Sequence, residues 1–360
     1  MEPSGGLEVA GVGLRRSFLV AAVLAGAAVA LYLLWILVAI GGTHMTLQVD
    51  DVGQWVAAWC ATAVCCVAAF RAPQARATWA LFAVSSFAWG AGEAVWCYYA
   101  LLKDVPVPFP SLADVGFLSA IPPAFAALLV YPGGRRSAIA RVEGVLDGCI
   151  IATSLLFASW ATILGPLFRD HRGSVLKQVI SVAYPMSDVV MVSLVVILIA
   201  RGGSRLRVDL ALVMSGVVAF AVADSSFTYL TAVNSYSGGN YLDTGWVAGY
   251  LLIALGAWWA MTSRRIAPER TEAATVSLVA PYIPVLIVLA VTSVQLLRGK
   301  QMEPVSWFMA LALVLMVLGR EALNVWHRTG GNRRSHRSDV SLDDRARSRH
   351  PDIDAVGADR

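Results

Sequence analysis

Long apolar runs, separated by short polar connections, fill most of the chain. A helix that crosses the hydrocarbon core of a bilayer needs roughly 20 residues, because about 30 Å is spanned at 1.5 Å per residue. Ten runs are long enough, and they predict ten transmembrane helices. These helices are expected near residues 17–40, 52–70, 77–101, 114–132, 143–166, 178–200, 208–231, 243–262, 276–297 and 305–326.

The composition points to the same class of protein. Apolar residues fill 58% of the 360 positions and charged residues only 14%, whereas soluble domains carry about 25% charged residues. Such a chain cannot cover itself with a water-facing surface, so we expect an all-α integral membrane protein, a bundle of about ten transmembrane helices. The formal net charge of +4 then says little about nucleic acid, which is not an expected partner.

Three regions follow from this pattern: a cytoplasmic N-terminal segment 1–16, a membrane domain 17–326 and a C-terminal tail 327–360. The tail is rich in Arg, Asp and Ser and has few large apolar residues. It cannot bury a core, so it is expected to be disordered, with its arginines near anionic lipid.

The positions of the basic residues predict the orientation. With the N-terminus inside and the loops assigned alternately to the two faces, 22 of the 28 Lys and Arg residues lie inside and 6 outside. Cytoplasmic loops of membrane proteins carry an excess of Lys and Arg. We therefore expect a multi-pass protein of the plasma membrane with both termini in the cytoplasm.

One stretch of the chain is repeated. DVGFLSAIPPAFAALLVYPGGRR, at positions 114–136, returns as DTGWVAGYLLIALGAWWAMTSRR at positions 243–265. Asp114 and Asp243 begin the two copies, and Phe117 is replaced by Trp246. An acid at a helix start caps free amide groups, and an aromatic side chain suits the headgroup region. Asp114, Asp243 and Trp246 are thus expected to cap helices or to form the rim of a site.

Glu93 and Asp224 lie in helix interiors, where capping does not explain them. Aromatic residues flank each acid at i−4 and i+3, on one helical face. These rings are Trp89 and Trp96 around Glu93, and Phe220 and Phe227 around Asp224. The separation of the two acids along the chain is close to that between the two copies of the repeated stretch. The third and fourth helices therefore resemble the seventh and eighth, as in a parallel repeat.

Asp188 is the most deeply placed acid of the predicted spans. A charged group inside a span costs about 2.5 to 3.5 kcal/mol at its centre, and so marks function by default. The preceding turn holds Tyr184 and Pro185, and a proline kink would open space for a ligand. Asp147 and Asp209 differ, because each lies near an arginine-rich loop, where a cap or an interfacial salt bridge is expected.

Two interpretations of the interior acids stay open. An acid flanked by aromatic rings can hold a cation or a polar ligand, with cation–π attraction of about 0.5 to 2 kcal/mol. Alternatively, protonated acids could bond to neighbours such as Tyr98, Ser225 or Tyr229 in a purely structural arrangement. The histidines and cysteines lack metal-ligand spacing within a span, so neither a metal nor a cofactor is expected.

Four stretches together resemble a known membrane region: PSLADVGFLSAIPP, AYPMSD, VADSSFTYL and YLDTGWVAGYLLIALGAW. They are similar to the multi-span N-terminal sensor region of bacterial, especially actinobacterial, membrane-bound GGDEF and EAL diguanylate cyclases and phosphodiesterases. The resemblance covers roughly positions 15–326 and implies a region that receives a signal and passes it to a cytoplasmic output domain. Only the short tail 327–360 follows the last predicted span, so the sequence predicts an input module without its catalytic domain.

These observations favour a non-enzymatic membrane sensor or accessory signalling module. Its outward-facing acidic and aromatic site would be coupled to cytoplasmic loops or to a partner. The alternative is a secondary transporter or permease for a cation or a proton-coupled solute. The expected partners are the lipid bilayer and a cytoplasmic or membrane signalling protein, with a homo-oligomer as a further option. No nucleophile–base pair stands out, so an enzyme is not expected.

Overall fold

The computed structural model describes residues 5–131, 138–161, 165, 174–202, 207–232, 235–262, 282–299 and 301–347. All regular secondary structure within these ranges is helical. The α-helices are α1 (Gly5–Val38), α2 (Gly42–Arg71), α3 (Arg76–Cys97), α4 (Leu112–Leu129), α5 (Ala138–Ser159), α7 (Val175–Gly202), α8 (Val208–Ala232), α9 (Thr244–Thr262), α11 (Tyr282–Leu297) and α12 (Pro304–Arg347). Short turns of other helical types are η1 (Pro73–Ala75), η2 (Tyr98–Leu102) and η4 (Tyr241–Asp243).

Most of these helices have the length and composition of membrane spans. Within the described residues, eight helical segments are long and apolar enough to cross a bilayer, and Leu146–Ser159 and Val288–Leu297 form two shorter apolar helices. Large apolar side chains such as Leu24 on α1 and Leu311 on α12 point outward, at 65% and 58% exposure. The prediction of an all-α multi-pass membrane protein is therefore confirmed.

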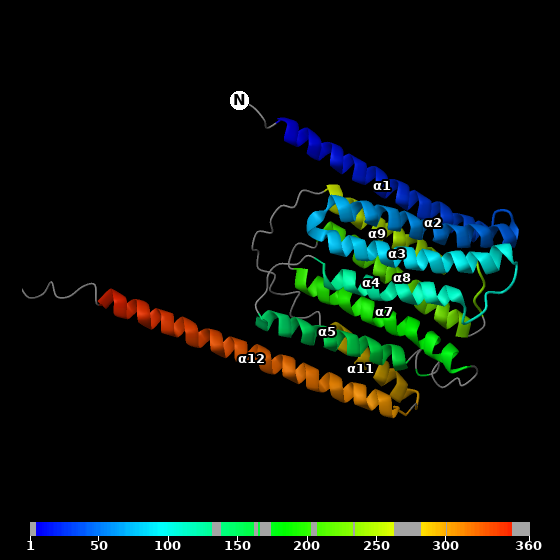
Figure 1. Cartoon of the computed structure of the whole chain (residues 1–360). Helices are drawn as coiled ribbons and strands as arrows, with labels where there is room; N and C mark the ends of the chain where they lie inside the picture. Colours follow the sequence, from blue (N-terminus) through cyan, green and yellow to red (C-terminus); the bar gives the residue numbers. More distant parts are fainter. Residues whose placement is uncertain are drawn as a thin grey trace, which may run out of the picture.

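Six helices form a closed ring around the centre of the molecule. Successive contacts join α2 to α3, α3 to α4, α4 to α7, α7 to α8, α8 to α9, and α9 back to α2. Helices α2 and α7 consequently lie on opposite sides of the ring. Figure 1 shows these helices side by side, with α1 and α12 at the two outer edges.

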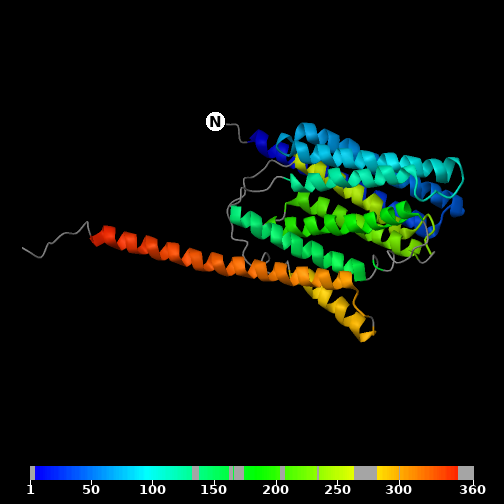
Figure 2. The ribbon, with the colours of Figure 1, turned by 60° about the horizontal axis from the view of Figure 1, so that its bottom comes forward.

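The other helices cover the outside of this ring. Helix α1 packs on α9 and α2, α5 packs on α7, and both α11 and α12 pack on α5. Figure 2 shows α12 continuing well beyond the bundle. Helix α12 continues to Arg347, and the disorder expected of the tail from residue 327 stays a prediction. The stretch 327–347 contains no proline, the residue that stops a helix; residues 348–360 lie outside the described residues.

The repeated stretch has the same helix start in both halves. Ser111 and Asn240, which hold matching positions just before the two copies, each cap a helix. In one half the Ser111 N–H donates to Asp114 Oδ2 at 2.7 Å, and in the other the Asn240 N–H donates to Asp243 Oδ2 at 3.0 Å. Capping is thus confirmed for both acids. The arginine pairs that close the two stretches lie outside the described residues.

Helix packing is also repeated. A Cβ added to Gly116 on α4 would lie 2.4 Å from Gly92 Cα on α3. A Cβ added to Gly245 on α9 would lie 2.9 Å from the Ala223 side chain on α8. These contacts occupy matching positions, so small residues let α4 approach α3 as closely as α9 approaches α8. The pair α3–α4 in one half of the ring, α2–α3–α4, therefore matches the pair α8–α9 in the other half, α7–α8–α9, in helix start and in close packing.

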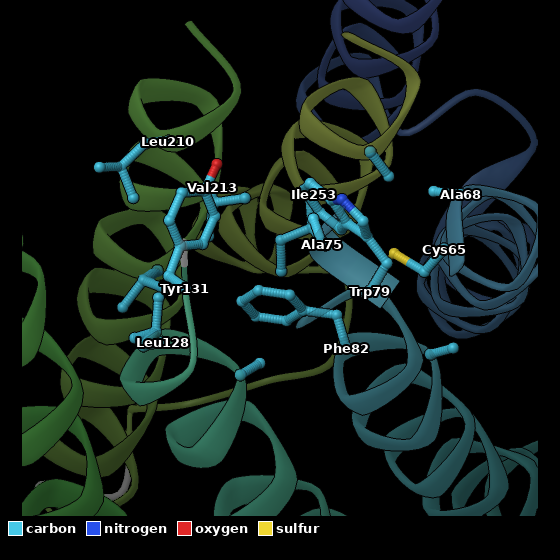
Figure 3. Packing of buried hydrophobic residues seen from close by; sticks show 14 of the residues in the cluster. Cys65, Ala68, Ala75, Trp79, Phe82, Leu128, Tyr131, Leu210, Val213 and Ile253 are labelled. Atoms are coloured by element: carbon cyan, nitrogen blue, oxygen red, sulfur yellow. The ribbon is translucent and has the colours of Figure 1, made fainter. Parts of the chain in front are cut away.

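One apolar core fills the end of the ring where α3 and α8 begin. All six ring helices contribute to it. Trp79 and Phe82 of α3 are nearly fully buried there, and Figure 3 shows Phe82 between the helices, close to Tyr131, which follows α4. The Trp79 ring lies 5.9 Å from Phe82 and 6.5 Å from Tyr131. This end of the ring is tightly packed and apolar.

Candidate functional site

A cavity of about 870 Å³ occupies the remaining part of the ring. Five carboxyl groups line it: Asp51, Glu93, Asp114, Asp188 and Asp224. All eight residues predicted from the sequence to bind a ligand line it as well: Glu93, Asp188, Asp224, Trp89, Trp96, Phe220, Phe227 and Tyr184. Of the three predicted capping or rim residues, Asp114 and Trp246 line the cavity and Asp243 does not. The structure thus brings these side chains together; ligand binding by them stays a prediction.

Helix α2 contributes two acids that were absent from the predicted site. The expected span began at residue 52, whereas α2 begins at Gly42, so Asp50 and Asp51 are buried at 1% and 2% exposure. A signal for this was present, because Thr46, Asp50 and Gln54 follow each other at i+4 spacing, and all three are buried. These polar residues lie on the same face of α2 as its buried apolar residues.

The two acids of α2 have different surroundings. Asp50 Oδ1 accepts hydrogen bonds from the Tyr32 hydroxyl and from Gln54 Nε2, and Oδ2 accepts one from the Gly239 N–H at 2.7 Å. Asp51 lies beside Trp96 and faces the cavity, and its Oδ2 accepts no hydrogen bond from a described residue. Asp50 is therefore held by the fold, whereas one oxygen of Asp51 remains free.

The other half of the ring shows a comparable pair. Asp224 Oδ1 of α8 accepts a 2.7 Å hydrogen bond from Trp246 Nε1 of α9. The Asp188 carboxyl of α7 lies within hydrogen-bonding reach of Asp224. Its Oδ2 is buried and accepts no hydrogen bond from a described residue. Helix α7 continues through Pro185 without interruption, so the expected opening beside Asp188 needs no break in the helix.

The capping acids are tied to the opposite half of the ring. Asp114 on α4 accepts a 2.7 Å hydrogen bond from the Tyr184 hydroxyl of α7. Asp243, at the start of α9, lies beside Asp50 of α2 and accepts a 3.2 Å hydrogen bond from the Tyr236 hydroxyl. Burial raises the pKa of Tyr236, and the Asp243 carboxyl raises it further, so this hydroxyl stays a donor.

Aromatic rings form a continuous wall between the acids of α2 and the acids of α7 and α8. Tyr250 of α9 lies between Trp89 of α3 and Phe220 of α8, with ring centroids 5.0 and 4.7 Å away. These two flanking residues hold matching positions in the two halves. At the outer part of the cavity, the Trp96–Phe117 contact at 6.5 Å matches the Phe227–Trp246 contact at 5.9 Å.

The two ends of the cavity differ. Segments that connect helices line one end, including Pro106, Phe109 and Tyr236, together with exposed Lys177 at the start of α7. At the other end the lining residues Phe82 and Ile253 belong to the apolar core. The cavity therefore reaches the end of the ring where α4 and α9 begin and is closed toward the opposite end.

A separate polar cluster joins α5, α11 and α12. Arg320, at 5% exposure, donates from Nε to Asp147 Oδ1 at 2.5 Å and from Nη1 to the Tyr282 hydroxyl at 2.7 Å. Glu321 contacts both Tyr282 and Arg320. A salt bridge was expected for Asp147, but the partner is an arginine inside the last predicted span. Asp209 forms its expected ion pair, with Arg207 at 2.5 Å.

Within the described ranges, His, Cys, Asp and Glu side chains form no group of three or more that could hold a metal ion. Tyr98 and Tyr229, suggested above as partners of the acids, point outward at 45% and 58% exposure. Comparison with known proteins found no matching family model, no matching curated protein and no matching solved structure.

Proposed function

We propose that this chain is a membrane receptor module that binds a small organic cation in the cavity of its six-helix ring. A single observation carries the proposal: five carboxyl groups and a wall of aromatic rings line one cavity. Carboxylates attract a cationic group, and aromatic faces add cation–π attraction of about 0.5 to 2 kcal/mol. In this arrangement Asp188 and Asp51 would contact the cation, and Trp89, Phe220 and Tyr250 would hold its apolar part.

The cation would enter from the end of the ring where α4 and α9 begin. By the distribution of Lys and Arg in the sequence, this end faces away from the cytoplasm. The chain would then lie in the plasma membrane with both termini inside. Acids near the entrance raise the local concentration of a cation and speed its approach.

Helix contacts supply a route from the cavity to the long C-terminal helix. Asp188 lies on α7, α7 contacts α5, and α5 contacts α12. A ligand can shift an equilibrium between two arrangements only if it binds one of them better. We propose that the cation favours one position of α7 against α8, and that α5 and α12 follow. Helix α12 would report this change to a cytoplasmic or membrane partner, including a second copy of this chain.

Binding to the purified full-length protein tests the receptor. A titration would compare alkylammonium ions with neutral alcohols and carboxylates of the same shape. The cations alone should bind, and the double variant Asp51→Asn with Asp188→Asn should weaken their binding at least ~10-fold, which is about 1.4 kcal/mol. Hydrogen exchange in α5 and α12 should change with ligand in the wild type and not in Asp188→Asn. Equal binding of the neutral alcohols would contradict the proposal.

Transport is the second candidate, and the repeated halves favour it. Many transporters place their substrate sites between internal repeats near the bilayer midplane, and here the cavity lies between two three-helix units that each contain one copy of the repeated helix pair. The apolar core around Trp79 and Phe82 would have to open for passage. Proteoliposomes separate the two functions: a transporter moves the bound cation across the membrane, whereas a receptor binds it without flux.

A further inference from the structure

Among the described residues, two buried carboxyl oxygens without a hydrogen-bond partner lie on opposite walls of the cavity. Asp51 Oδ2 belongs to α2 and Asp188 Oδ2 to α7. Helices α2 and α7 hold matching places in the two halves of the ring. They face each other across the cavity, and no helix of the ring lies between them. Each oxygen is buried and accepts no hydrogen bond from a described residue. A buried carboxylate oxygen without a donor costs free energy, so each calls for a donor from a ligand.

A second acid supports each of these oxygens. Glu93, at 3% exposure, lies within electrostatic range of Asp51, and Asp224 lies beside Asp188. The other charged lining groups are Asp114, whose oxygens accept from Ser111 and Tyr184, and exposed Lys177 at the entrance. Apart from Asp114, the carboxyl groups of the cavity therefore lie in two separate places, one in each half.

The region between the two places is apolar. Tyr250 lies near both Glu93 and Asp224, and its ring packs between Trp89 and Phe220. An aliphatic chain could lie along this aromatic wall and bury its methylene groups, at about 0.8 kcal/mol each in apolar transfer. Three rings in contact make up the length of this wall. A surface of that length suits an extended aliphatic chain better than a compact ion.

We propose that the ligand is a linear organic dication, with one ammonium group bound by Asp51 and the other by Asp188. This inference rests on the proposed function and specifies its ligand. Each ammonium group supplies the donor that the carboxyl oxygen lacks, and the aliphatic chain crosses the Tyr250 wall. Because one end is already bound, the second ammonium group meets its carboxylate at a high effective concentration.

A titration of the full-length protein in detergent with α,ω-diamines of increasing length tests the proposal. The probes are 1,4-diaminobutane to 1,10-diaminodecane, each paired with the monoamine of equal chain length. One diamine length should bind best, at least ~10-fold tighter than its monoamine, as two sites acting together require. Asp51→Asn and Asp188→Asn should each reduce the diamine affinity to that of the monoamine.

The same variants provide the controls. Monoamine binding should change by less than about threefold in either single variant, because one carboxyl group remains, and it should be lost in the double variant. Size-exclusion chromatography and circular dichroism would establish that each variant is folded. If the monoamine binds wild type as tightly as every diamine, the dication is wrong and the organic-cation site stands. If folded wild-type protein binds neither amine, both this inference and the proposed function are wrong.

Discussion

The indole N–H of Trp246 donates a 2.7 Å hydrogen bond to the carboxylate of Asp224, and so joins α9 to α8 at the cavity wall. In the other half, Phe117 and Glu93 hold the matching positions, and a phenyl ring has no such donor. Among the described residues, the Cys97 thiol approaches the Glu93 carboxyl at 4.0 Å, a much longer contact. The repeated helix pairs thus share their caps and close glycine contacts, while Asp224 and Glu93 differ in how firmly they are held.

Trp246→Phe should destabilise the protein by about 1–3 kcal/mol, because it leaves a buried Asp224 oxygen without its donor. Trp258→Phe on the same helix is a matched control: it removes the same atoms, and Trp258 Nε1 has no hydrogen-bond partner among the described residues. Thermal unfolding in detergent would compare the two variants. Equal losses of stability would mean that the hydrogen bond contributes nothing.

Asp50→Ala and Asp51→Ala should have opposite effects, although the two residues are adjacent. Loss of Asp50 leaves the donors of Tyr32, Gln54 and Gly239 without an acceptor, which should cost about 1–3 kcal/mol or more. Loss of Asp51 removes a buried group with an unpaired oxygen, so stability should hold or rise. Chemical denaturation of the unliganded protein measures both; a larger loss for Asp51→Ala would contradict this assignment of roles.

Gly116→Ala should push α4 away from α3, because the new Cβ would lie 2.4 Å from Gly92 Cα and 2.8 Å from the Ala88 carbonyl oxygen. Overpacking of this kind costs about 1–3 kcal/mol. Gly26→Ala on α1 is the control, since nothing lies within 4 Å of its added Cβ, and alanine favours a helix by about 1 kcal/mol. We expect a lower melting temperature for the first variant and an unchanged or higher one for the second.

Asp147→Ala should strongly destabilise the contact of α5 with α12. It leaves the Arg320 guanidinium buried without its closest carboxylate, and breaking a buried pair on one side costs about 3–5 kcal/mol. Glu321→Ala touches the same network at a side chain that is 50% exposed, so its effect should be small. The double variant Asp147→Leu with Arg320→Met should recover most of the stability, and a failure to recover would argue against an unpaired charge as the cause.

Much of this fold follows from the sequence, because bilayer thickness dictates helix length. The two repeated segments and the acids in their interiors could also be recognised, since i−4 and i+3 spacing places Trp89 and Trp96 on the face of Glu93. What the sequence could not supply is the closure of the ring. The contact of α4 with α7 skips α5 in the chain, and no local pattern encodes such a neighbour.

Two features of the candidate site were missed for separate physical reasons. Asp50 and Asp51 stand before the apolar run, so a span defined by hydropathy starts after them, although the helix itself starts at Gly42. Tyr250 lies in an apolar segment and matches Ile121 in the other half, so nothing local distinguishes it from lipid-facing residues. Its place between Trp89 and Phe220 depends on three helices meeting.

The charge preference and accessibility of the cavity can be measured directly by thiol labelling of Asp188→Cys, in a chain whose five native cysteines are replaced by alanine. A cationic and an anionic methanethiosulfonate of similar size would be added outside intact cells. The remaining carboxyl groups should make the cationic reagent react at least ~10-fold faster. Equal rates, a faster anionic reagent, or labelling that appears only after the cells are permeabilised would contradict an outward-facing cation site.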